Sequence, residues 1–181
     1  MNWIIFLIIA CEIGFWLFVL SGLYTRYILK KKRLSIWLLA MSPVVDLILL
    51  IATGYDLSRG GVAGTPHALA AVYIGISVGF GKKVIQWADE KFQAKVLKVS
   101  IQKEELFGLA FAKDYAKGWI RHIIAYLVGA GLIGAILLWV GDFERTQAMI
   151  RVLGIWTIVL IIDTVITISY FIVPKRPKLN D

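Results

Sequence analysis

The strongest constraint on the fold is a series of long apolar runs, each close to the length that a lipid bilayer requires. A transmembrane helix needs about 20 predominantly apolar residues, and five segments of this sequence meet that requirement. These segments are 3–25, 35–56, 65–88, 122–141 and 149–173. Because 59% of the 181 residues are hydrophobic, a soluble domain of this length could not bury them all. We therefore predict an all-α, polytopic integral membrane helix bundle of five transmembrane helices, forming a single membrane domain over residues 1–181.

The distribution of positive charge orients these spans. Most of the 20 lysines and arginines follow the first span, lie between the third and fourth spans, or fall in the tail after the fifth. The two remaining loops contain only Arg59 and Arg145. Because basic loops stay on the cytoplasmic side, we predict an N-out/C-in topology. The net charge of +8 clusters beside apolar runs, which favours contact with the lipid bilayer and argues against a nucleic-acid partner.

The segment 89–121 is too polar to span and is expected to be cytoplasmic. Within it, residues 104–119 place Phe107, Phe111 and Tyr115 at helical spacing on one side. The pattern predicts an amphipathic helix that either lies in the membrane interface or packs on the inner ends of the spans. The basic residues of this segment could bind a partner protein or anionic lipid. Those considered for this role are Lys98, Lys103, Lys113 and Lys117.

Three carboxylates fall near the middle of separate spans. They are Glu12, Asp46 and Asp163. A charge at that depth costs about 2.5–3.5 kcal/mol on insertion scales, so such groups face a protein interior or a water-filled cavity. Two interpretations remain open: protonated acids that donate hydrogen bonds between helices, or a path for a proton or cation. No lysine or arginine lies at the same depth to form ion pairs.

A second set of polar residues lies toward the outer side. Tyr73 and Ser77 are one turn apart in the third span, while Asp56 and His67 bracket the loop before it. These four residues are expected to line the outer approach to the acids. One histidine beside one acid is a weak metal signal, since a metal site normally needs three or four ligands. The prediction therefore includes no metal site and no cofactor. His67 is expected to bond Asp56, to bond groups on the Asp163 side, or to anchor at the interface.

Part of the sequence resembles a known family. The segments that carry the likeness are Pro43-Val44-Val45-Asp46, Asp56-Leu57, 67–75, Gly79-Phe80-Gly81 and Trp87-Ala88-Asp89-Glu90. Together they resemble a YmcC-like group of small, multi-pass, uncharacterised bacterial membrane proteins. The resemblance covers roughly residues 1–95, and it implies a bacterial inner-membrane protein without implying any activity. The remainder of the chain resembles no family that we can name.

The leading functional prediction is a proton- or cation-coupled transporter or channel. Its centre would be a midplane carboxylate cluster of Glu12, Asp46 and Asp163. The alternative is a non-catalytic membrane subunit or regulator that binds a partner or anionic lipid through the basic cytoplasmic segment, and either protein could form a homo-oligomer. An enzyme is not expected, because we find no credible serine–histidine–acid set, no HExxH and no CxxC.

Overall fold

The computed structural model describes residues 3–95 and 105–175, and it forms five α-helices and no strand within them. The helices are α1 (Trp3–Tyr27), α2 (Lys32–Ser58), α3 (Thr65–Lys95), α4 (Gly108–Val140) and α5 (Gln147–Ile172). All five of these described helices are long and apolar enough to cross a membrane. The predicted all-α polytopic bundle is thus confirmed.

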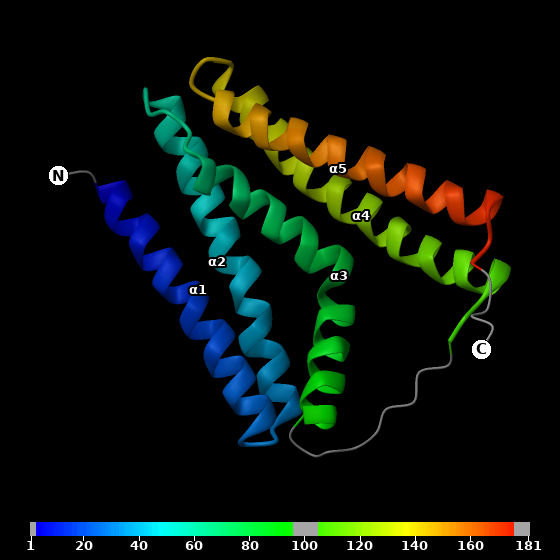
Figure 1. Ribbon diagram of the computed structural model, residues 1–181. Helices are drawn as coiled ribbons and strands as arrows, with labels where there is room; N and C mark the ends of the chain where they lie inside the picture. Colours follow the sequence, from blue (N-terminus) through cyan, green and yellow to red (C-terminus); the bar gives the residue numbers. More distant parts are fainter. Residues whose placement is uncertain (1–2, 96–104, 176–181) are drawn as a thin grey trace.

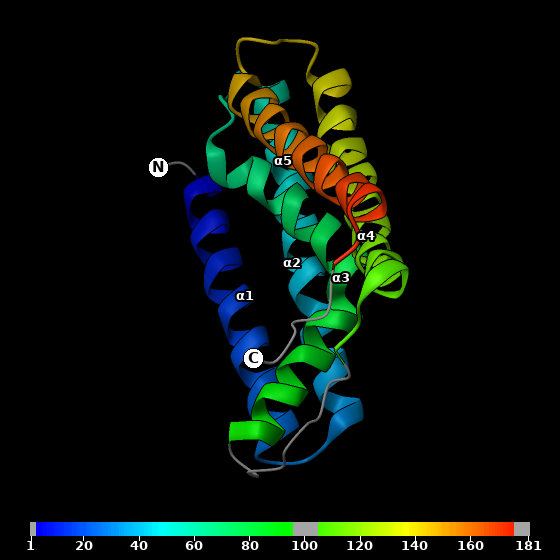
Figure 2. The ribbon, with the colours of Figure 1, turned by 45° about the vertical axis from the view of Figure 1, so that its right-hand side comes forward.

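The helices form two antiparallel pairs with α3 between them (Figures 1 and 2). α1 packs along α2, and α4 packs along α5. α3 contacts α2 on one side and α4 and α5 on the other. It bends in its middle, so that its two halves follow different directions in Figure 1. α3 therefore supplies most of the contacts between the two pairs, and α2 also meets α4 directly, where Gly54 lies against Trp139.

The outer faces of the helices are apolar and uncovered. Large hydrophobic side chains there are strongly exposed, for example Leu138 at 87%, Ile172 at 73% and Trp37 at 70%. Exposure of so much apolar surface to water is unfavourable for a monomer of this size, whereas lipid chains solvate it. The protein is therefore embedded in a bilayer, and these faces contact lipid.

Glycines allow α3 and α4 to approach closely. A Cβ atom added at Gly79 would lie 2.5 Å from the Arg121 carbonyl oxygen and 2.9 Å from Ala125 Cβ. A Cβ at Gly75 would overlap the Ala125 carbonyl oxygen. Gly75 and Gly79 are four residues apart, so they form a small-residue face of α3 against which α4 packs.

The structure differs from the sequence prediction at the start of α4. We expected an amphipathic helix before the fourth span, but the described part of that segment continues into the span as one helix, Gly108–Val140. Its aromatic stripe is packed against protein: the Phe111 and Tyr115 rings each lie 4.9 Å from the Tyr170 ring of α5. Residues 96–104, including Lys98 and Lys103, lie outside the described residues.

Candidate functional site: two carboxylate centres

The three mid-span acids do not converge on one site. Glu12 and Asp46 line a cavity of about 300 Å³ between α1, α2 and α3. Asp163 lines a different pocket, of about 290 Å³, between α3, α4 and α5. The single midplane cluster proposed from the sequence is therefore two centres in this structure.

The first centre, which we call the α1–α3 cavity, has an acidic and an aromatic wall. Its lining includes Glu12, Phe15, Trp16, Asp46, Leu49 and Tyr73. Phe15 stacks on Tyr73 with ring centroids 6.1 Å apart, so α1 and α3 meet through aromatic rings at this level. Tyr73 thus lies in the same cavity as two of the acids.

Asp46 is the buried acid of this cavity. It is 6% exposed, and its Oδ2 atom is enclosed without a hydrogen-bond partner among the described residues. The spacing of α2 explains the burial, since Ser42, Asp46, Leu49 and Thr53 recur every three or four residues on its buried face. The Thr53 hydroxyl donates to the Leu49 carbonyl oxygen at 2.8 Å instead of reaching Asp46. Glu12, by contrast, is exposed at the edge of the cavity.

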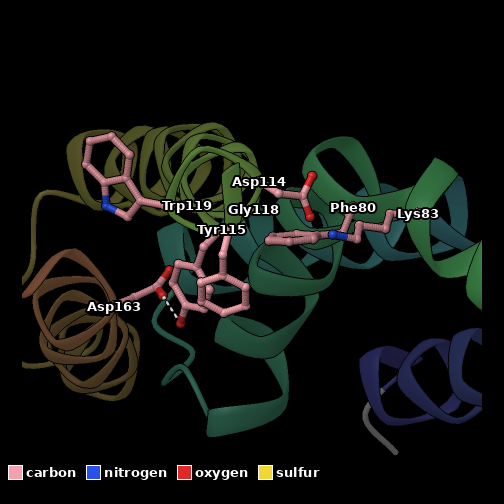
Figure 3. Close-up of a pocket in the computed structure, with 8 residues that line it drawn as sticks. Phe80, Lys83, Asp114, Tyr115, Gly118, Trp119 and Asp163 are labelled. Carbon is pink, nitrogen blue, oxygen red and sulfur yellow. Dashed lines mark hydrogen bonds between the residues drawn. The ribbon is translucent and has the colours of Figure 1, made fainter. Parts of the chain in front are cut away.

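The second centre, which we call the α4–α5 seam, encloses Asp163 in hydrogen bonds. Asp163 Oδ2 lies 2.8 Å from His122 Nδ1, and the Tyr115 hydroxyl donates to Asp163 Oδ1 at 3.3 Å. Figure 3 shows Tyr115 and Asp163 meeting across the pocket, with Phe80, Lys83 and Asp114 on its other side. The carboxylate therefore ties the first half of α4 to α5.

A tryptophan sets the protonation pattern of this seam. Trp156 Nε1 donates to His122 Nε2 at 3.2 Å, so Nε2 must be the unprotonated nitrogen of the ring. The proton of a neutral imidazole then sits on Nδ1 and is donated to Asp163. Asp163 accepts from two described donors, an arrangement that suits an ionised carboxylate beside a neutral histidine.

Further side-chain hydrogen bonds connect α4 and α5. The Trp119 indole donates to the Thr164 hydroxyl at 2.8 Å, and the Tyr126 and Thr157 hydroxyls lie 2.7 Å apart. Polar side chains in lipid associate helices in this way because the hydrocarbon offers them no competing partner. The seam is therefore a satisfied interhelical network.

The other predicted residues lie apart from both centres. His67 Nδ1 accepts the Gly64 backbone N–H at 2.9 Å at the start of α3, and no hydrogen bond joins it to Asp56 in the described part of the chain. Asp56 is half-buried in the preceding turn, where its carbonyl oxygen accepts the Arg59 and Gly61 N–H groups. Both residues thus stabilise the turn between α2 and α3.

Ser77 lines a third cavity, of about 640 Å³, between the C-terminal halves of α1 and α3 and the N-terminal half of α2. Its walls are mainly apolar, and they include Arg26 and Lys82. Arg26 forms a bidentate ion pair with Asp89 of α3. The arginine thereby fastens the end of α1 to α3.

His122 and Tyr115 were absent from the sequence-based site. The sequence nevertheless contains a signal for the contact between His122 and Asp163. α4 and α5 are joined by a short loop, and the two residues lie about equally far from that loop along the chain. Antiparallel neighbours bring such positions to the same level. No group of three or more histidine, cysteine, aspartate or glutamate residues able to hold a metal occurs in the described residues.

The five apolar helices and their buried polar centres define a small polytopic helical membrane protein. The chain is 50% identical over 180 residues, 99% of its length and 97% of the relative's, to a Bacillus subtilis (strain 168) protein named "Uncharacterized membrane protein YmcC". It therefore belongs to the YmcC family. The likeness recognised in the sequence ended near residue 95, whereas the alignment extends over α4 and α5 as well.

Neither of the other two comparisons found a counterpart. No protein-family model matches the chain. No solved structure matches it either.

Proposed function

We propose that the protein moves protons or cations across the membrane and that the α1–α3 cavity is its binding site. The observation that carries this proposal is the buried, unpartnered Asp46 carboxylate in a cavity that Glu12 also lines. A buried polar group without a partner costs about 1–3 kcal/mol of stability. Folding gains nothing from such a group, so a ligand that completes its hydrogen bonding or charge explains its presence.

The proposal gives the acids different roles. Asp46 binds the proton or cation at the buried end of the cavity, and Glu12 meets it at the exposed edge. Tyr73 supplies a hydroxyl and a ring on the α3 side. Asp163 holds α4 against α5 and takes no part in binding. The proposed setting is a bacterial inner membrane with the N-terminus outside, as the basic loops indicate.

A flux measurement on reconstituted protein tests the proposal. The full chain is placed in vesicles that contain a pH-sensitive dye, and an imposed gradient drives proton or monovalent-cation movement. Asp46→Asn, which keeps the shape and removes the charge, should abolish the flux. Glu144→Gln removes an exposed acid from the loop between α4 and α5 and should leave it unchanged. Absence of flux from the parent, or an unchanged flux in Asp46→Asn, would reject this function.

A second candidate is a subunit or regulator that recognises anionic lipid or a partner. It is favoured by Lys113 and Lys117, which are exposed near the start of α4, and by Lys83 at the neighbouring pocket. Juxtamembrane lysines attract anionic headgroups with about 1 kcal/mol each. The paired change Lys113→Gln and Lys117→Gln should reduce retention of phosphatidylglycerol in native mass spectra. The change Arg151→Gln, at the opposite end of the bundle, should not.

A further inference from the structure

The α1–α3 cavity offers aromatic faces as well as carboxylates. Phe15 lies between two other rings, stacked on Tyr73 and edge-to-face with Trp16 at a centroid distance of 5.6 Å. All three rings line the cavity that contains Glu12 and Asp46. Aromatic faces attract cations within about 6 Å through their negative π-clouds, and tryptophan does so most strongly.

The remaining lining argues against a bare metal ion. Small hard cations are held by about six or more oxygen ligands. The described lining offers the oxygens of two carboxylates and one phenol together with the Cys11 thiol, with apolar residues such as Leu49 and Leu69 between them. The cavity volume of about 300 Å³ is that of a small organic ligand rather than a stripped ion. Apolar walls suit alkyl or aryl substituents on the cation.

We propose that the ligand of this cavity is a monovalent organic ammonium ion with alkyl or aryl groups. Asp46 neutralises its charge, and the rings of Phe15, Trp16 and Tyr73 surround its substituents. This inference rests on the proposed function, since it names the class of cation that the Asp46 site takes. It adds a recognition element, the aromatic wall, that proton transport alone would not require.

The test is binding of radiolabelled benzyltrimethylammonium to the purified full chain in zwitterionic nanodiscs. Choline should displace the label, whereas its uncharged isostere 3,3-dimethylbutan-1-ol and sodium ion, at equal concentration, should not. Asp46→Asn should weaken binding about tenfold or more. Trp16→Leu should weaken binding about threefold to tenfold. Trp16→Phe keeps an aromatic face and should retain most of the affinity of the parent. Glu144→Gln serves as the matched control for removal of an acid, and gel filtration checks that each variant is folded.

The outcomes separate this inference from the proposed function. No saturable binding to the parent, equal displacement by the alcohol or sodium, or insensitivity to both Asp46→Asn and Trp16→Leu would overturn the organic-cation assignment. A proton flux that depends on Asp46 without ammonium binding keeps the proposed function and rejects this ligand. Ammonium binding without any flux keeps the ligand and rejects transport.

Discussion

The α1–α3 cavity and the α4–α5 seam each contain a mid-span aspartate, but the two aspartates differ in their hydrogen-bond partners. Asp163 accepts hydrogen bonds from His122 and Tyr115 on the neighbouring helix. Asp46 is 6% exposed, yet its Oδ2 has no partner among the described residues. Depth in a span is therefore a poor guide to what an acid does. The groups that face the acid distinguish a structural carboxylate from a binding one.

The two regions also differ in how their helices are joined. Indole–hydroxyl and hydroxyl–hydroxyl bonds connect α4 and α5 along their length. α1 and α3, in contrast, are joined at their C-terminal ends, where Arg26 pairs with Asp89 and Tyr27 stacks on Phe92 at 4.2 Å. Nearer the start of α1, Glu12 lines a cavity, and Phe15 contacts α3 through the Tyr73 ring at the wall of that cavity. α3 thus lies at the boundary between the hydrogen-bonded α4–α5 seam and the more open α1–α3 cavity.

The largest stability effect should come from Asp163→Leu. Leucine leaves the Tyr115 hydroxyl and the His122 Nδ1–H without their acceptor. We expect the free energy of unfolding in detergent to fall by about 3 kcal/mol, since each bond to a charged group contributes about 1.5–3 kcal/mol. Ile162→Leu, at the exposed neighbouring position, is the control and should be nearly neutral. An unchanged stability would show that the seam does not depend on its carboxylate.

Gly79→Ala should follow, at a cost of about 2 kcal/mol from overpacking. The new methyl group would meet backbone atoms of Arg121 and Ala125, which cannot move aside as a side chain can. Gly81→Ala on the same helix has no described atom within 4 Å of its added Cβ and should be neutral or slightly stabilising. Thermal unfolding of the two variants makes the comparison. Equal effects would mean that α3 is not held tightly against α4.

Asp46→Leu should have the opposite sign to Asp163→Leu. Removing an unpartnered buried carboxylate relieves its desolvation, and the adjacent cavity has room for the larger side chain. We expect a gain of about 1 kcal/mol in unfolding free energy, together with loss of flux. The free energies of unfolding of Asp46→Leu and Asp163→Leu, measured together in detergent, test this difference in sign. A large loss for Asp46→Leu would make this acid a structural element like Asp163.

The smallest effect concerns proton positions and involves no change in stability. The Trp156 bond requires the Nδ1–H tautomer of His122, whereas His67 accepts the Gly64 N–H at Nδ1 and must carry its proton on Nε2. Because the sequence contains only 2 histidines, ¹⁵N spectra of a histidine-labelled sample should show one ring of each tautomer. Trp156→Phe removes the donor to Nε2 and should shift the ¹⁵N signals of His122 alone, while Asp163 still keeps the proton on Nδ1. Two rings of the same tautomer in the parent would contradict the assigned hydrogen bonds.

Hydropathy and charge were sufficient to predict the five helices, because in lipid each span must satisfy its backbone within a helix. Helical periodicity puts Asp46 on one face with Ser42 and Thr53, at spacings of four and seven residues, and that face is buried. These are local properties of a helix, and they depend only on spacing. The close approach of α3 and α4 at Gly75 and Gly79 likewise depends on the spacing of two glycines on one face of a helix.

Which helices meet each acid could not be predicted in this way. Asp163 and Asp46 have similar apolar surroundings in sequence, and the difference arises because α4 brings His122 and Tyr115 to Asp163. α1 brings Glu12 and aromatic rings to Asp46. Similarly, the pairing of Asp89 with Arg26 depends on α1 and α3 meeting at their C-terminal ends. Long-range contacts of this kind follow from helix arrangement, which single-span patterns do not encode.

The proposed division of roles, in which Asp46 binds the proton or cation and Asp163 stabilises the contact between α4 and α5, is tested by paired flux measurements. Asp46→Asn and Asp163→Asn are the same chemical change, made in the α1–α3 cavity and in the α4–α5 seam. Flux per folded molecule should be abolished in Asp46→Asn and should stay close to that of the parent in Asp163→Asn. Loss of flux in folded Asp163→Asn, with flux retained in Asp46→Asn, would contradict the account.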